Sequence, residues 1–342
     1  MEQWKEYKLG DVLCIKYGKD HKLLASGSIP IYGSGGIMRY ADQSIYEGPS
    51  ILIPRKGSLN NIMYSDKPFW TVDTMFWTTI NEKIANPKYL YYLLSKKDFA
   101  SLNVGSAVPS LTVPVIENIH ITLPIKSVQT KIASLLSSLD DKIEFNRRIN
   151  DNLEQQATAL FDKMFPSITN GNCKIGDWLR PKRGIGLLTK DTILGDVPVV
   201  AGGLRPAAYH NKANTLSPVV TISASGANAG YVALWNKPVW SSDSSYIDSS
   251  LTSDVYFWYV LLKKRQKEIF DAQTGSAQPH IYPQHIAELP IKQLEKEQII
   301  KYTEQATPLF KMVGNLTEEN IKLAQLRDTL LPKLMSGELK IS

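Results

Sequence analysis

The sequence contains few residues of the kinds that build metal sites, disulfides or membrane spans. Its 342 residues include only two cysteines, Cys14 and Cys173. Neither has a cysteine or histidine partner at the spacing of a zinc site, so we predict no metal framework and interpret both as small core residues. No apolar run approaches the roughly 18 residues of a bilayer span, and no secretory segment opens the chain. We therefore expect a cytoplasmic protein that does not contact a membrane.

The sequence also lacks the signatures of an enzyme. No GxxxxGK[ST] phosphate loop occurs, and the Asp/Asn-Pro-Pro-aromatic run of N6-adenine methyltransferases is missing. The acidic groups at 140–142 and 295–297 match a metal nuclease only in composition, and exposed helix positions explain them better. The five histidines show no spacing that pairs a nucleophile with a base. We expect no catalytic residue, no metal and no cofactor in this chain.

The charge that is present is weakly basic. The formal net charge is +6 and the isoelectric point is near 9.0, which suits a polyanionic partner without requiring one. Most of the positive excess falls in residues 1–124 and 170–290.

The clearest positive feature is an internal repeat with an offset of about 170 residues. Five segments recur in the same order: KLGDVLCIKYG (8–18) with KIGDWLRPKRG (174–184), IPIYGSGG (29–36) with VPVVAGG (197–203), SILIPRKGSLNNIMY (50–64) with VVTISASGANAGYVA (219–233), Trp70 and Asp73 with Trp240 and Asp243, and GSAVPSL (105–111) with GSAQPHI (275–281). Because all five keep their order, we infer that the chain arose by duplication.

Each repeat begins with a globular part. Short apolar runs such as 50–54 and 219–223, separated by Gly, Pro and Ser, predict short strands and tight turns. Helical spacing of apolar residues predicts a helix over about 87–100 and another over about 255–272. Each globular part is therefore expected to be mixed α and β.

Each repeat ends with a heptad pattern. Seam residues alternate in steps of four and three from Ile132 to Met164, and each has a counterpart 170 residues later, from Tyr302 to Leu334. Asn146, Asn150 and Asn320 lie in the seam, where polar residues fix register. Pairing of the two helices buries both seams; the alternative is that each seam packs on its own globular part.

These patterns predict an α+β fold with two similar mixed α/β domains, each followed by a long helix, the two helices pairing as an antiparallel coiled coil. The expected parts are domain 1 (1–124), a central helix (125–169), domain 2 (170–290) and a C-terminal helix (291–342).

The combination resembles the specificity subunit of type I restriction-modification systems. The motifs that carry the resemblance are the opening from Trp4 to Asp11 and its echo at 174–177, the GSAxP loops at 105–109 and 275–279, and the closing LLPKLMSGELKI at 330–341. The chain departs from some members of that family in beginning almost directly with domain 1, so an N-terminal helical segment is not assumed.

The resemblance implies that each domain is a target recognition domain that reads one half of a split sequence in double-stranded DNA. The helices would act as a ruler for the gap between the halves. Two methyltransferase subunits that bind S-adenosylmethionine and two restriction subunits that use ATP and Mg²⁺ would be the partners, while this chain would be non-catalytic. Because the domains differ in sequence, an asymmetric bipartite target is expected.

Loops that carry polar and cationic side chains are the candidates for DNA contact. The densest cluster in domain 1 holds Arg55, Lys56, Ser58, Asn60 and Asn61, and Arg39 is a further candidate. The equivalent loop of domain 2 has lost the cations but keeps Ser225 and Asn228. Phosphate contacts there are expected from Lys182, Arg183, Arg205, His210, Asn211 and Lys212. The alternative for each is an ordinary surface or hairpin turn. Trp70, Asp73, Trp240 and Asp243 are interpreted as core and turn support, and the GSAxP loops as shared turns.

Two other functions stay open at this point. A free-standing two-domain DNA-binding or scaffold protein would use its helices without recruiting a methyltransferase. A duplicated β-rich enzyme acting on a small molecule would need a catalytic motif, and none is found in the sequence.

Overall fold

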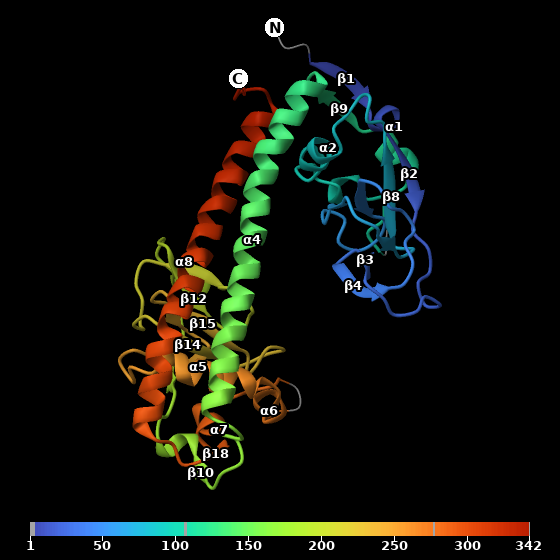
Figure 1. Ribbon diagram of the computed structural model, residues 1–342. Helices are drawn as coiled ribbons and strands as arrows, with labels where there is room; N and C mark the ends of the chain where they lie inside the picture. Colours follow the sequence, from blue (N-terminus) through green and yellow to red (C-terminus); the bar gives the residue numbers. More distant parts are fainter. Residues whose placement is uncertain (1–3, 106–107, 276–277, 342) are drawn as a thin grey trace. The chain divides into compact units, whose positions relative to one another are not determined.

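The computed structural model describes residues 4–105, 108–275 and 278–341 (Figure 1). The chain forms two compact units, one of residues 1–143 with 322–342 and the other of residues 144–321. Each unit combines small sheets and short helices with one stretch of each of two long helices. The expected α+β fold with two similar domains is confirmed. Because the units divide within the long helices, the linear boundaries expected at 124, 169 and 290 stay a prediction.

The strands of the first unit form three sheets. β1 (Lys5–Lys8) pairs with β9 (His120–Leu123). The largest sheet has the strand order β2 (Leu13–Tyr17), β8 (Met75–Ile80), β5 (Ser50–Pro54), β6 (Met63–Ser65). The third has the order β4 (Gly36–Ala41), β3 (Ile29–Gly33), β7 (Trp70–Thr71), and its β3 and β7 run parallel.

The second unit repeats these sheets in the same order, which confirms the duplication. β10 (Cys173–Lys174) pairs with β18 (Pro290–Ile291). The largest sheet runs β11 (Lys182–Arg183), β17 (Ser244–Asp248), β14 (Val219–Ser223), β15 (Val232–Trp235). The third runs β13 (Ala208–His210), β12 (Val197–Val200), β16 (Trp240–Ser241), again with one parallel pair.

The burial of the strands follows their apolar pattern. β5 and β14 come from continuous apolar runs, and all five residues of each are buried. β2 instead alternates, with Leu13 and Ile15 buried and Cys14 exposed. The interpretation of Cys14 as a core residue was therefore wrong. Cys173 is also only partly buried, and its Sγ lies 3.1 Å from Oε1 of Gln293.

The short helices are shorter than the sequence pattern predicts. α2 (Pro87–Leu94) begins at an N-cap, Asn86, whose side chain accepts from the amide of Tyr89, but it ends at Leu94 rather than near residue 100. The second predicted helix is split into α5 (Val255–Lys264) and α6 (Gln266–Asp271). At the break the fully buried side chain of Arg265 binds Glu268 and the carbonyl of Pro290. The remaining short helices are α1 (Leu9–Val12), α3 (Val113–Glu117) and α7 (Pro283–Ala287).

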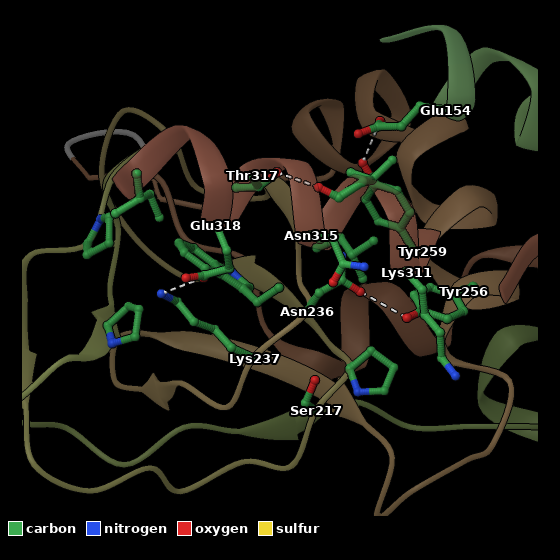
Figure 2. A pocket seen from close by; sticks show the side chains of 18 of the residues that line it. Glu154, Ser217, Asn236, Lys237, Tyr256, Tyr259, Lys311, Asn315, Thr317 and Glu318 are labelled. Carbon is green, nitrogen blue, oxygen red and sulfur yellow. Dashed lines mark hydrogen bonds and ion pairs between the residues drawn. The ribbon is translucent and has the colours of Figure 1, made fainter. Parts of the chain in front are cut away.

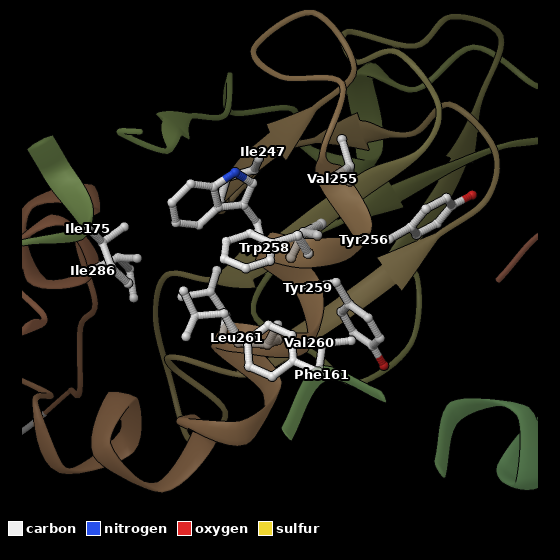
Figure 3. Close-up of a cluster of buried hydrophobic side chains, with 14 of the residues drawn as sticks. Phe161, Ile175, Ile247, Val255, Tyr256, Trp258, Tyr259, Val260, Leu261 and Ile286 are labelled. Carbon is white, nitrogen blue, oxygen red and sulfur yellow. The ribbon is translucent and has the colours of Figure 1, made fainter. Parts of the chain in front are cut away.

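The core of the second unit forms around α5. Figure 3 shows Trp258 and Leu261 of α5 among buried side chains from other elements, including Phe161 and Ile247. The ring of Phe161 lies 5.4 Å from the ring centroids of both Phe257 and Tyr302. The long helices therefore contribute to the core of the domain as well as to each other.

The two long helices are α4 (Lys126–Met164) and α8 (Lys296–Met335). Within the first unit, Ile132 and Leu136 of α4 share a buried cluster with Leu331 and Leu334 of α8. That cluster also contains the apolar residues of the adjoining sheets, so the seam packs on a partner helix and on a globular part at once. No helix in the described part of the chain has the length and apolar character that a bilayer crossing needs.

Within the second unit, polar contacts show how α4 and α8 pair. Nδ2 of Asn146 donates to Oδ1 of Asn320 at 2.9 Å, and Tyr302 donates to the carbonyl of Ala157 at 3.1 Å. Higher residue numbers on α4 thus meet lower numbers on α8. In the first unit Asp140 meets Arg327 at 2.6 Å, which continues the same trend. The predicted antiparallel pairing is confirmed within each unit.

Candidate nucleic-acid interface

The turn after the central strand has the same backbone frame in both units. After β5 it contains Arg55, Lys56 and Gly57, and after β14 it contains Ala224, Ser225 and Gly226. Gly57 has a φ of +87° and Gly226 a φ of +79°, a conformation that favours glycine. The repeat alignment made from the sequence therefore places equivalent residues together.

The same turn is tied to the loop that follows each GSAxP motif. The amide of Gly57 donates to the carbonyl of Pro109 at 3.2 Å, and that of Gly226 donates to Pro279 at 3.0 Å. The carbonyl of Arg55 accepts from Leu111 at 2.9 Å, and that of Ala224 accepts from Ile281 at 2.9 Å. The GSAxP motifs thus share a structural role at Pro109 and Pro279, while Ser106, Ala107, Ser276 and Ala277 lie outside the described residues.

We define the first corner as the group of residues around the turn after β5: Tyr17, Arg55, Lys56, Asp73 and Ser110. The guanidinium of Arg55 lies over the ring of Tyr17, with its Cζ 5.4 Å from the ring centroid. Its Nη1 donates to the backbone carbonyl of Asp73 at 3.2 Å. Lys56 is exposed and forms an isolated bridge to Ser110. The side chains of Tyr17 and Asp73 are exposed, so the corner faces solvent.

The second corner consists of Arg183, Ala224, Ser225, Asp243 and His280. Nη2 of Arg183 lies 2.6 Å from Oδ1 of Asp243, and the hydroxyl of Ser225 donates to the other carboxylate oxygen. Ser225 forms an isolated bridge to His280, as Lys56 does to Ser110. Both partners of the ion pair are partly exposed, with 41% of the Arg183 side chain and 38% of the Asp243 side chain accessible. Surface screening makes such a pair weakly stabilising, but it fixes where the guanidinium lies.

Three other predicted contacts of the first domain hold the turn. Asn60 accepts from the amide of Ala100 at 2.9 Å and donates to Asp98 at 3.1 Å. Asn61 donates to the carbonyl of Ser34 at 2.8 Å. Ser58 is exposed, and its carbonyl accepts from the amide of Asn61 at 3.0 Å. Asn60 and Asn61 therefore position the loop that carries Arg55 and Lys56.

Arg39 also makes internal contacts. It lies on β4, where its Nε donates to Nδ1 of His21 at 3.1 Å and its Nη2 donates to the carbonyls of His21 and Leu24. These bonds tie β4 to the loop between β2 and β3. The neighbouring Ile37 and Tyr40 are half exposed.

The predicted contacts of the second domain are spread over several loops. Lys182, Arg205, Asn211 and Lys212 are exposed, and Asn228 is half-buried with its carbonyl accepting from the amide of Tyr231.

His210, in contrast to these exposed residues, is buried. It retains 6% exposure, its Nδ1 accepts from the amide of Ile193, and its ring lies 5.2 Å from the ring of Trp240. A DNA contact by His210 would require the ring to leave this packing.

The paired tryptophans support the fold as interpreted from the sequence. The indole of Trp70 donates to the carbonyl of Lys19 at 3.0 Å, and that of Trp240 donates to Ile185 at 2.8 Å. Sequence reasoning gave Asp73 and Asp243 a supporting role only and did not consider Tyr17. The signal available in the sequence was the alignment of Tyr17 with Arg183, which shows that the second domain carries a cation where the first has an aromatic residue.

A separate pocket of about 640 Å³ lies in the second unit between α8, β15 and α5 (Figure 2). Its polar side chains pair with one another, as Lys237 does with Glu318 at 2.9 Å and Tyr259 with Glu154 at 3.1 Å. Burial raises the pKa of Glu154 above its usual value. None of the predicted DNA contacts lines this pocket. Among the described residues, no group of three or more His, Cys, Asp or Glu side chains has the geometry of a metal site.

Comparison with known proteins identifies relatives of this chain. Residues 1–155 match the family model of the type I restriction modification DNA specificity domain. The specificity subunit of the type I restriction enzyme MjaIX of Methanocaldococcus jannaschii is 25% identical, over 87% of this chain and 79% of that protein. The specificity subunit of the type I restriction enzyme HindI of Haemophilus influenzae is 25% identical over 48% of this chain and 41% of that protein.

A solved structure shares the fold. The crystal structure of a type I restriction-modification system S subunit from M. genitalium matches with a TM-score of 0.67 and 17% identity, over 97% of this chain and 96% of that one.

Proposed function

We propose that this chain, a relative of the type I restriction enzyme specificity subunits, is the subunit that recognises DNA in such a complex. It binds double-stranded DNA through two recognition domains, each of which reads one half of an asymmetric bipartite target. The chain is non-catalytic and directs adenine methylation and restriction by its partner subunits.

The observation that carries this proposal is the duplicated fold with different side chains at matched positions. The three sheets recur in the same order, and the turns after β5 and β14 share their bonds to Pro109 and Pro279. An enzyme with two equivalent active sites would keep the same polar side chains at both. A reader of two different half-sites needs one frame with two sets of side chains.

The partners follow from the relatives. We propose that two methyltransferase subunits that bind S-adenosylmethionine and two restriction subunits that use ATP and Mg²⁺ assemble on this chain. The antiparallel pairing seen within each unit gives the two helix seams one shared register.

DNA contact is assigned to cationic and polar side chains near the strand ends. Arg55, Lys56 and Ser58 would contact DNA in the first domain, with Asn60 and Asn61 holding their loop. Lys182, Arg183, Arg205, Asn211 and Lys212 would do so in the second, together with Ser225 and Asn228. Arg39 would act through the loop at 21–24 that it binds.

The test is to co-express the chain with a type I methyltransferase subunit from the same genome in a host without DNA methylation. Mapping of N6-methyladenine by long-read sequencing should reveal one split motif with a fixed gap. A continuous palindrome would contradict the proposal. Failure of the two proteins to co-purify, with DNA binding retained, would instead favour a free-standing DNA-binding protein.

A further inference from the structure

Each corner carries one guanidinium, but it comes from a different strand. In the first corner it is Arg55, which follows β5, and the end of β2 holds Tyr17. In the second corner the residue after β14 is Ala224, and the end of β11 holds Arg183. The backbone hydrogen bonds beside Tyr17 and Arg183 match. The amide of Gly18 donates to the carbonyl of Met75 at 3.0 Å, and the amide of Gly184 donates to the carbonyl of Ser244 at 2.8 Å. The guanidinium therefore comes from a different strand in each unit but lies at the equivalent corner.

Each corner also places an aspartate at the guanidinium. The turn from β7 to β8 has three residues and includes Asp73, and the turn from β16 to β17 has two and includes Asp243. Arg55 binds the backbone of Asp73, and Arg183 binds the carboxylate of Asp243. The carboxylate of Asp243 repels a phosphate group, so the second corner is not a phosphate cradle.

The guanidinium and the carboxylate together match the edge of one kind of base pair. In the major groove guanine presents two acceptors, which arginine binds as a fork, and its partner cytosine presents an amino donor, which a carboxylate accepts. The ring of Tyr17 and the carboxylate of Asp243 each hold their arginine in place before DNA arrives. Pre-organisation of this kind favours specific contacts over general attraction.

We infer that the two corners are the specificity-determining sites of the two domains, and that each reads a G·C base pair through its guanidinium, with the carboxylate of Asp243 also taking part in the second corner. This inference rests on the proposed function. It assigns Arg55 with Asp73 to one half-site and Arg183 with Asp243 to the other. The side chains of Lys56, Ser110, Ser225 and His280 lie on the same frame and would contact the adjacent positions.

The experiment uses the full chain with its methyltransferase subunits and maps methylated sites for the wild type and four variants. Arg55→Ala should relax a G·C position in one half of the motif only, and Arg183→Ala should relax one in the other half. The preference for G·C at that position should fall by about 5- to 150-fold. Arg55→Lys should relax the motif too, because lysine lacks the planar fork.

Lys83→Ala is the matched control. It removes one positive charge from the same domain, just beyond the opposite end of β8 from the corner, and should leave the motif unchanged. The unaffected half of each motif shows that the variant has folded.

An unchanged motif in both arginine variants would overturn the inference. So would a uniform loss at all sites, which marks a phosphate contact, or relaxation of the same half by both. If a variant complex does not methylate DNA, its affinity is measured for duplexes that differ at one base pair. An equal loss of affinity for all duplexes refutes the inference, and a loss of affinity confined to the duplex with G·C supports it. A wild type without a split motif would refute the proposed function instead.

Discussion

Replacing Asn146 with alanine should destabilise the unit formed by residues 144–321. Asn146 is fully buried, and its Nδ2 donates to Asn320 at 2.9 Å and to Glu319 at 2.7 Å. Alanine removes this donor from two acceptors in the helix seam, which costs about 1–3 kcal/mol. The better helix propensity of alanine recovers only about 0.5 kcal/mol of this. We therefore expect a net loss of stability.

Calorimetric melting of the full chain measures this loss. Because 1 kcal/mol shifts the Tm of a unit of this size by about 2–4 °C, the Tm should fall by about 1–10 °C. Asn152→Ala is the matched control, because Asn152 is exposed on the same helix and binds Gln156 on that helix. The double variant Asn146→Leu with Asn320→Leu should recover part of the loss, since the Asn146–Asn320 pair then becomes apolar while Glu319 stays polar. Equal melting of Asn146→Ala and Asn152→Ala would refute the reasoning.

Three further changes test the packing, the turn frame and a buried carboxyl. Phe161→Ala should cost about 3–5 kcal/mol in denaturant unfolding, because its ring is fully buried between α5 and α8; a loss under 1 kcal/mol would contradict this. Gly226→Ala should cost about 1–2 kcal/mol because of its φ of +79°, whereas Gly203→Ala, at an exposed position, serves as the control and should cost less. Burial raises the pKa of Glu154 above its usual 4.5, so folding favours the protonated form of this carboxyl. The stability that this preference contributes is present below pH 4.5 and is lost as the pH rises through the pKa of the folded state. Melting from pH 4 to 7 should show a smaller decline for Glu154→Gln, and an identical decline would exclude this carboxyl as its source.

Much of the fold could be predicted because the duplication supplies two copies of each signal. The continuous apolar runs at 50–54 and 219–223 became buried central strands, and the heptad seams became α4 and α8. The failures were local. The helix expected to 100 stops at Leu94, and the second is broken at Arg265, whose side chain binds Pro290 some 25 residues away. Sequence periodicity does not report such a long-range contact.

The candidate interface could be predicted in part. Sequence reasoning found the turn with Arg55 and Lys56, since glycine and cations between apolar runs mark an exposed loop. It assigned Arg183 to phosphate because the sequence around Lys182 and Arg183 gives no sign of a carboxylate partner. Asp243 is 60 residues from Arg183, and only the pairing of β11 with β17 brings them together.

The difference between the two corners also explains why the duplicated domains could diverge without losing their fold. The bonds that hold each turn run between backbone atoms, from Gly57 to Pro109 and from Gly226 to Pro279, so they do not depend on the side chains at the corner. The cation follows β5 in the first unit and ends β11 in the second, and the turn that holds the aspartate is one residue shorter in the second unit. The strand order stayed the same. Under the proposed function, a frame made of backbone bonds lets each half acquire a new DNA target through a few surface substitutions.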